Sequence, residues 1–507
     1  MAVDSTHQDY DGNVFAWWRA RDVIEGEDAV KAAGTRYLPR LDSQTDDEYV
    51  AYKKRAMFFN ATARTAEKLV GMIFRNEPII KLPETGSGAA EHHWSPRGRA
   101  LHRFVNDADM LGTTFAAYAK DVVTEIISVG RAGTLVDWQG AGSSGDHSTE
   151  RAYVVRYRAE DIINWRTERI NGRTLLTLVV LKESGEQQAE SGNGDDFTRE
   201  CVEQIRVLRL VKLLAKGEGA KPVWIYQVEI WQRKPSAKRR AKGNWELIET
   251  RTPLRLGQPL PLIPFVFHGP RHSLPLVDKL PLADIIAVNL DHYRLDADYK
   301  HGLHFTALPT AWVSGFDKAA TLRIGSSTAW VSETPGATAG FLEFTGQGLT
   351  TFERAMDRDE RLMAVLGTRM LEAQKRVGET AEAIELRQSG ENSVLSTVSL
   401  SVSDSLTQVL RWVYWWNSTE ETPEAIGEDI VLIQLNTDFT ARGMSSDELT
   451  AVVAAWQAGA ISRETMFELF RKGEVLPAGR TNSEETRLVA SGKVTNETTP
   501  EAGAVSQ

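Results

Sequence analysis

The segment from Leu274 to Trp416 decides the fold, and it opens with LPLVDKLPLADIIAVNLDHYRLDADYKHGLHF, residues 274–305. Ser273 is a suitable N-cap, and prolines are tolerated in or near the opening turns of a helix. A proline also disfavours helix in the residue before it, so Pro309 predicts the helix end. The apolar residues follow helical spacing at Leu282, Ile285, Ile286, Leu290 and Tyr293. The pattern therefore predicts a helix that starts at Ser273 and ends before Pro309.

A line of carboxylates occupies another face of this predicted helix. Asp284, Asp291 and Asp298 are seven residues apart, which is nearly two turns, so they lie almost in line. A one-sided ladder with steps of ~10 Å does not converge on one metal ion. The line is either a solvated helix face or a negatively charged wall.

Residues 306–348 show no helical period. The tetrapeptide AWVS occurs twice, at residues 311–314 and 329–332, and GFLEF follows at 340–344. These runs predict a small unit of two or three strands. Because so small a unit is marginal alone, we expect Trp312 and Trp330 to lie at an interface with a neighbouring chain.

Helical periodicity returns after this unit. Thr350 and Glu353 match a capping box and predict a second helix. The pattern breaks at residues 374–379, where Gly378 supplies backbone freedom and Lys375 and Arg376 project. A last helix from Thr380 to Trp416 would span roughly 55 Å. We place its serines on outer positions, so the helix looks suited to close packing in an assembly.

Composition is that of a folded protein of several domains. The chain has 507 residues, 42% hydrophobic and 25% charged, and its net charge of −10 argues against a generic nucleic-acid coat. Cys201 alone cannot form an intramolecular disulfide and fits a reducing compartment. The N-terminus lacks signal-peptide features, and no run of 18 apolar residues occurs.

Helices and strands are segregated along the chain, which predicts an α+β fold. We expect helices at 46–74 and 101–129, strands between 133 and 267, and short helices capped by Ser445, Ser462 and Ser483.

Several motifs have a functional and a structural interpretation. GAGSSG at 140–145 matches a dinucleotide-binding pattern, but too few residues follow for the crossover helix, so we interpret it as a hairpin loop. The basic stretch 233–242 is either a site for phosphate or an acidic partner, or a solvated hairpin loop.

His292, His301 and His304 are interpreted as residues near a helix end instead of metal ligands. The helix pair 447–458 and 462–472 has the length of a helix-turn-helix, but its aromatic residues indicate packing. Since no catalytic motif is present, we expect no enzyme activity, cofactor or metal.

Local motifs, taken in order, resemble those of tailed-bacteriophage portal proteins. NLDHYR at 289–294, followed by DY at 298–299, HGLHF at 301–305 and PT at 309–310, is similar to the stem-to-clip segment of one portal subfamily. GETAE at 378–382 is similar to the start of the long helix in many portals. Four further motifs resemble the N-terminal half of the same portal subfamily: NAT at 60–62, FRNEP at 74–78, GRAG at 130–133 and VD at 136–137.

The resemblance covers nearly the whole chain and implies a portal-type α+β architecture. Its parts would be a wing (1–272), a first stem helix (273–305), a clip (306–348), a second stem helix (349–373), a tunnel loop (374–379), a long helix returning to the wing (380–443), and a helical crown with a mobile tail (444–507).

The resemblance also implies a function and partners. Such proteins form a ring, usually a dodecamer, at one capsid vertex of the virion after assembly in the host cytoplasm. Double-stranded DNA passes through the channel, the terminase large subunit docks, and a head–tail adaptor later replaces it. The major capsid or scaffolding protein surrounds the ring. Asp284, Asp291 and Asp298 would line the channel, and Lys375 and Arg376 would contact DNA at its constriction.

Two other classes of protein stay open at this point. A cytosolic enzyme would need a convergent acid–base or phosphate site, which the sequence does not show. A non-catalytic monomeric scaffold or adaptor of the virion would lack such a site too, and the presence of a ring separates it from a portal.

Overall fold

The computed structural model describes most of the chain. The described residues are 3–83, 96–139, 151–188, 199–213, 223–233, 244–307, 310–316, 330, 332–342, 346, 348–370, 393–437, 439, 444, 446–473, 475–476, 482 and 484–489. The chain divides into two compact units. Unit 1 comprises Met1–Trp17, Glu67–Pro281 and Ala373–Gln507, and unit 2 comprises Trp18–Ala66 and Leu282–Glu372. Helices α1 (Gln8–Glu25) and α4 (Ala61–Ile73) have residues in both.

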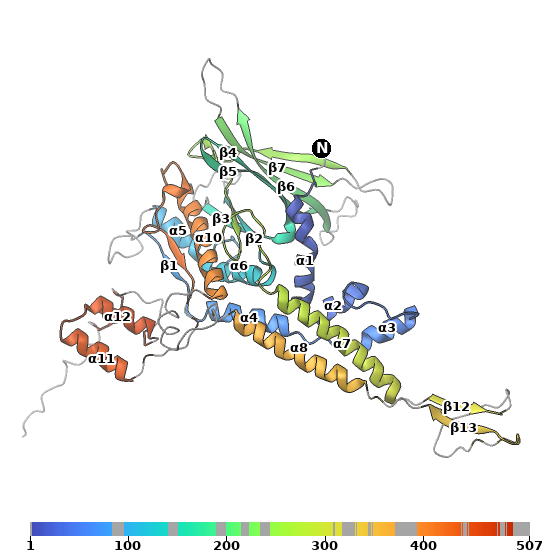
Figure 1. Cartoon of the computed structure of the whole chain (residues 1–507). Coiled ribbons are helices and arrows are strands. Elements are labelled where there is room, and N and C mark those ends of the chain that lie inside the picture. The colour runs from blue at the N-terminus through green and yellow to red at the C-terminus, as the bar shows by residue number, and fades with distance from the viewer. Residues whose placement is uncertain are drawn as a thin grey trace, which may run out of the picture. The chain divides into compact units, whose positions relative to one another are not determined.

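A three-stranded antiparallel sheet and the helices packed on it form one part of unit 1 (Figure 1). The sheet has the order β11 (Phe265–His268), β2 (Ala132–Gln139) and β3 (Arg151–Arg158). Helices α5 (Pro96–Asn106), α6 (Phe115–Val129) and α10 (Val394–Trp416) pack against it and one another. Most of β2 and α6 is buried.

A five-stranded antiparallel meander forms the second sheet of unit 1. Its strands follow chain order: β4 (Ile162–Ile170), β5 (Arg173–Gln188), β6 (Arg199–Leu213), β7 (Val223–Arg233) and β8 (Trp245–Arg251). One ion pair and one hydrogen bond to a carboxylate join the sheets. Arg251 on β8 binds Asp137 on β2 at 2.8 Å, and Glu183 on β5 accepts hydrogen bonds from Tyr157 on β3 and Arg206 on β6.

Shorter elements complete unit 1. Strands β1 (Ile79–Lys81) and β14 (Leu432–Gln434) pair with each other, as do β9 (Leu254–Arg255) and β10 (Gln258–Pro259). Helices α11 (Ser446–Gln457) and α12 (Arg463–Lys472) follow, and Ser462 caps α12 as predicted.

Helix α10 corrects two predictions. It begins at Val394 with Ser393 as its N-cap, so the single helix predicted from Thr380 to Trp416 is wrong. Its serines are buried within unit 1 and are not on outer positions: Ser399 Oγ donates to Asn436 O at 2.7 Å, and Ser401 Oγ donates to Gly269 O at 2.9 Å. The small side chains therefore serve packing inside the unit, with their hydroxyls bonded to neighbouring backbone.

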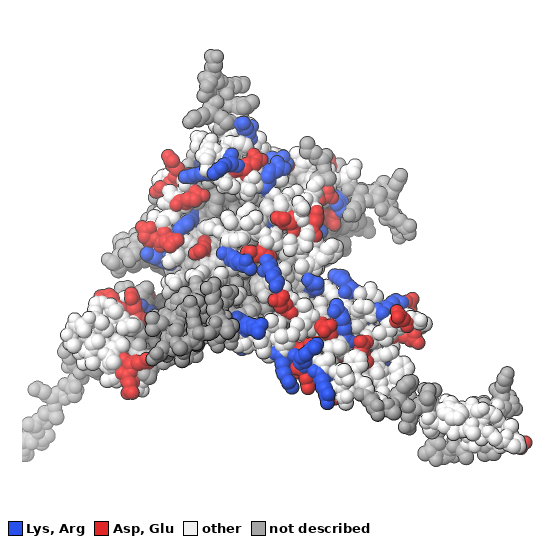
Figure 2. All heavy atoms as spheres, in the orientation of Figure 1, with Lys and Arg blue, Asp and Glu red and all other residues white. Residues whose placement is uncertain are grey.

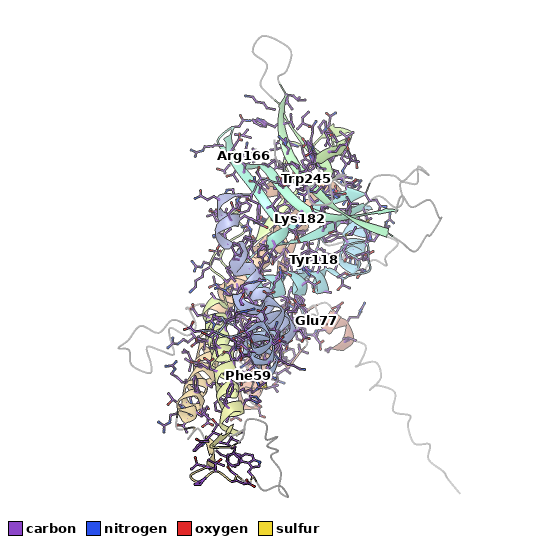
Figure 3. The ribbon with its side chains drawn as sticks, turned by 90° about the vertical axis from the view of Figure 1, so that its right-hand side faces the viewer. Phe59, Glu77, Tyr118, Arg166, Lys182 and Trp245 are labelled. Carbon is purple, nitrogen blue, oxygen red and sulfur yellow. The ribbon has the colours of Figure 1, made fainter. Side chains whose placement is uncertain are left out.

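A buried chain of hydrogen bonds links α6, the three-stranded sheet and α10. Ser405 Oγ donates to Val402 O at 3.0 Å, so its oxygen accepts from His268 Nδ1 at 2.7 Å. His268 Nε2 then accepts from Thr134, which accepts from Tyr118, each at 2.6 Å. Figure 3 labels Tyr118. This order needs a neutral imidazole, and burial lowers the pKa of His268 to about 3.

Unit 2 contains α2 (Glu27–Ala33), a 3-10 turn (Gly34–Arg36), α3 (Asp46–Arg55), α7 (Ala283–Ala307) and α8 (Leu349–Arg369). Strands β12 (Thr310–Ser314) and β13 (Thr338–Leu342) pair antiparallel between α7 and α8 in the sequence. Figure 1 shows the two long helices side by side, with the strand pair beyond their ends.

Two helices predicted as continuous are interrupted. The predicted helix 46–74 is α3 and α4, separated by residues 56–60, and the predicted helix 101–129 is α5 and α6, separated by residues 107–114. In the second break Met110 has a φ of 66° and Gly112 a φ of 91°, which a helix cannot accommodate. Thr114 then caps α6.

The predicted boundaries of the two arm helices also need correction. Helix α7 starts at Ala283 instead of Ser273, because Arg131 Nη1 donates to the carbonyls of Pro275 (3.1 Å) and Leu276 (3.0 Å). The capping box predicted at the start of α8 does not form, since Gly348 is the N-cap there and Glu353 accepts from Tyr299.

We predict that His268 makes unit 1 sensitive to acid. An unfolded histidine takes up a proton below about pH 6.5, whereas folded His268 stays neutral down to about pH 3. The stabilisation is complete above pH 6.5 and is lost as pH falls, by about 1.4 kcal/mol per pH unit. Urea unfolding at pH 7.5 and 5.5 measures how much unfolding free energy is lost between the two pH values. This loss should be about 1 kcal/mol larger in the wild type than in His268→Gln. Equal losses would contradict the assignment.

Candidate assembly site: the helix–hairpin–helix arm

Helix α7, strands β12 and β13, and helix α8 form one antiparallel element, which we call the arm. His292 Nε2 lies 3.6 Å from Glu360 Oε1, and Tyr299 donates to Glu353 Oε1 at 2.6 Å. Closer to the strands, Leu349 packs directly against the backbone of Gly302. In each of these pairs, and in the pairs between β12 and β13, the two partners lie almost equally far along the sequence from one common midpoint. The helices and the hairpin therefore share one antiparallel register.

The arm's first helix is fixed to the rest of unit 2 by polar side chains. Asn289 is fully buried: its Oδ1 accepts from Thr62 N (3.1 Å) and Oγ1 (2.8 Å), and its Nδ2 donates to Phe59 O at 2.7 Å. Two turns further on, Asp296 accepts from Met57 N at 2.6 Å. Figure 3 labels Phe59, which lies in the break between α3 and α4. These bonds supply partners for backbone groups that the break would otherwise leave unsatisfied.

The three predicted channel residues have different surroundings. Asp284 and Asp291 are exposed on α7, and Asp291 lies 3.9 Å from Arg294. Asp298 is half-buried and accepts a hydrogen bond from Tyr52 at 2.5 Å. Burial and this bond raise the pKa of Tyr52 above its ordinary value, so the phenol keeps its proton. The line is therefore not a row of equivalent carboxylates, and its place in a channel wall stays a prediction.

The strand pair at the end of the arm exposes apolar side chains on both faces. Trp312 and Phe341 belong to pairs one residue apart in the register, so they project to opposite faces. They are 47% and 52% exposed, and Val313 is 37% exposed. The Trp312 ring lies over Gly340, where a side chain would meet it at 3.0 Å.

The repeated tetrapeptide is only partly a pair of strands. Residues 311–314 lie in β12, as predicted, but β12 pairs with β13 at 338–342. Of the second copy, Trp330 and Ser332 are described and lie outside the strands. Trp330 is half-buried, and its ring centroid is 6.4 Å from that of Phe341. Trp312 and Trp330 therefore occupy the same small unit, and their role at an interface stays a prediction.

Some predicted residues lie outside the described part of the chain. They are Lys375, Arg376 and Gly378 in the proposed tunnel loop, the glycine pattern at 140–145, and residues 234–242 of the basic stretch.

The histidines near the end of α7 have aromatic neighbours. The ring centroids of His301 and Phe305 are 4.7 Å apart, and burial lowers the pKa of His301 below its ordinary value. Among the described residues, no group of His, Cys, Asp and Glu has the arrangement of a metal site. Within the same residues, no helix has both the length and the apolar character that crossing a bilayer requires.

The arm and α10 coincide with a region that has been defined as a domain in other proteins. A domain of unknown function (DUF4055) matches residues 281–417. No curated protein matches the chain.

Two solved structures resemble the chain at low sequence identity. One is a chain from the neck of an empty gene transfer agent (GTA) particle computed with C6 symmetry: identity is 11%, the TM-score is 0.36, and the match covers 81% of this chain and 90% of that one. The other is a chain from the virion of a native GTA particle: identity is 12%, the TM-score is 0.34, and the match covers 88% and 98%.

Sequence reasoning missed the polar attachment of α7. Asn289 was quoted above only as part of the NLDHYR motif, and Asp296 was not singled out; in the structure Asp296 also lies 3.4 Å from Lys300. Both residues interrupt the apolar face of a helix, and a buried polar residue needs a partner. That interruption was the available signal, but the partner loop is more than 200 residues away in the sequence.

We predict that Asn289 is important for the stability of unit 2. Asn289→Ala leaves the Thr62 N–H and the Phe59 carbonyl without their buried partner, which should cost about 2–3 kcal/mol. Asp291→Ala, on the exposed side of the same helix, should change stability by less than about 0.5 kcal/mol. Urea unfolding of both variants measures the difference. Equal effects would show that the Asn289 bonds do not hold α7 in place.

Proposed function

We propose that the chain is the portal subunit of a phage-like particle. In this proposal it assembles into a ring, with twelve copies as the usual number, at one vertex of the capsid. Double-stranded DNA enters and leaves through the channel, the terminase large subunit docks during packaging, and a head–tail adaptor binds later.

The exposed tip of the arm is the observation that carries this proposal. Trp312, Val313 and Phe341 are held on a two-stranded unit that has too little core to stabilise itself. Large apolar side chains exposed on both faces of so small a unit indicate a protein interaction site. A ring of identical arms would bring each tip against its neighbours, and this arrangement buries the surface without needing a different partner.

The order of elements gives further support. The described arm consists of a helix, a strand pair and a second helix, and α10 follows as a buried helix of unit 1. This is the order of stem, clip, stem and long helix that the sequence motifs of portal proteins imply. We assign Lys375 and Arg376 to the constriction of the channel, where adjacent cations would contact phosphates with a strength that falls as salt rises.

The proposed role requires no catalysis by this chain. ATP hydrolysis would belong to the docked motor, and the portal would act as channel and docking ring. The competing proposal is a non-catalytic monomeric scaffold or adaptor of the virion. A monomer would leave the apolar tip exposed to solvent. The oligomeric state of the chain therefore distinguishes the two proposals.

We predict that the purified chain forms closed rings and that the tip is needed for them. Native mass spectrometry and negative-stain images should show a ring for the wild type. Replacing Trp312 and Phe341 with Ser should raise the protein concentration for half assembly by at least about tenfold, because buried aromatic side chains contribute about 1–3 kcal/mol each.

Leu254→Ser is the matched control, since Leu254 is 54% exposed on β9 and lies outside the arm. It should assemble as the wild type does. A wild-type chain that stays monomeric at micromolar concentration would contradict the proposed function. Rings that are unaffected by the double tip substitution would contradict the role of the tip.

A further inference from the structure

A stripe of arginines lies on the outer face of α8. Arg354, Arg358 and Arg361 are exposed and follow the spacing of one helix face. Met363 and Met370, which are buried, each lie nine residues after Arg354 and Arg361. Nine residues are two and a half turns, so the stripe faces away from the buried seam. Figure 2 shows Lys and Arg side chains gathered over α8.

A line of acids with the same spacing lies on α7. Asp291 and Asp298 are seven residues apart, as are Arg354 and Arg361, which corresponds to ~10 Å along each helix. The side chain of Asp291 is 56% exposed. Asp298 is half-buried, and its Oδ1 accepts a hydrogen bond from Tyr52.

The antiparallel register puts these opposite charges at matching levels of the arm. Asp291 precedes His292, and Arg361 follows Glu360, the residue that lies opposite His292. Similarly, Asp298 precedes Tyr299, and Arg354 follows Glu353, the partner of Tyr299. Each acid is therefore level with one arginine.

Within one copy the matched charges do not pair. Among the described residues, neither Arg354 nor Arg361 has an acidic group within 4.0 Å, the distance that defines an ion pair. The cation nearest Asp291 is Arg294 at 3.9 Å, and its Nε donates to Tyr37 O. Arg358, the third member of the stripe, lies 3.3 Å from Asp359, its neighbour in the sequence. Its side chain is 73% exposed.

We propose that the arginine stripe of one copy binds the acidic line of the next copy, with Arg361 opposite Asp291 and Arg354 opposite Asp298. This inference rests on the proposed ring. Copies related by rotation lie at the same height, so charges that are level within one arm stay level between neighbouring arms. A heterologous contact joins two different faces, which is the arrangement that α8 and α7 offer.

The two charge lines would fix the register of neighbouring arms. Exposed ion pairs contribute little individually, but complementary charges select the correct partner orientation and penalise like-charge contacts. Because each copy contributes both lines, the pairs repeat at every interface of the ring. The proposal moves Asp291 and Asp298 from the channel wall, where sequence alone placed them, to the contact between copies. It does not depend on Asp284.

Charge reversal at the Asp291–Arg361 pair tests the proposal, since both residues are exposed and neither holds the fold. Asp291→Arg and Arg361→Asp should each raise the protein concentration for half assembly by about tenfold at low salt. The wild type should also lose rings as NaCl rises from 50 to 500 mM, because salt screens the exposed pairs. Asp42→Arg and Arg19→Asp, which reverse exposed charges outside the arm, are the matched controls.

Mixing the two reversed variants separates a contact between copies from one within a copy. Asp291→Arg chains carry arginine at both positions, and Arg361→Asp chains carry aspartate at both. Equal amounts of the two should form rings of alternating copies at a protein concentration at which neither variant assembles alone. Native mass spectrometry of one isotope-labelled variant would show the alternation.

The outcomes distinguish this inference from the proposed function. Rings of the mixture, with each variant alone impaired, are the expected result. Wild-type rings with unimpaired variants, or impaired variants that mixing does not rescue, would overturn the charge pairing while leaving the ring intact. A wild type without rings would overturn both proposals. If the stripe instead binds a different, acidic protein, the wild type should form rings and the variants should be unimpaired. That result would overturn the charge pairing between copies.

Discussion

The single antiparallel register of α7 and α8 is the constraint on which the rest of the arm depends. Tyr299–Glu353 and His292–Glu360 set it, and β12 and β13 continue it without a shift. Because the register is continuous, the helices determine which strand residues face each other, and hence that Trp312 and Phe341 project to opposite faces. The same register makes the acidic and basic lines level. The apolar tip and the charged flanks are thus consequences of one packing arrangement.

Buried polar bonds hold both units in unique arrangements. In unit 2, Asn289 and Asp296 bind backbone of the segment between α3 and α4. In unit 1, the chain from Tyr118 through His268 to Ser405 joins a sheet to two helices. A fully satisfied buried network specifies one packing because any shift leaves polar groups unpaired. In the proposed ring, such networks would keep the packing within each unit the same in every copy.

Local chemistry predicted the α+β class, most strands, the strand pair in the arm and the end of α7. It failed where distant acceptors compete with local structure. The helix predicted at 46–74 breaks because side chains of α7 bind its backbone, and the helix start predicted at Ser273 fails because Arg131 binds two carbonyls. The serines of α10 were placed outside because periodicity identifies a face but not what covers it. Of the candidate site, the sequence singled out Trp312 and Trp330, whereas the exposed Phe341 and the level at which the arginine stripe meets the acidic line emerged only from the structure.

The central claim is that identical arms surround a common channel, and a cryo-EM reconstruction of the assembled protein tests it most directly. The account predicts a closed ring in which α7 and α8 of each copy run beside those of the next, with the β12–β13 tips in contact at one end. A reconstruction in which the arms point outward, with tips separated and exposed to solvent, would contradict it.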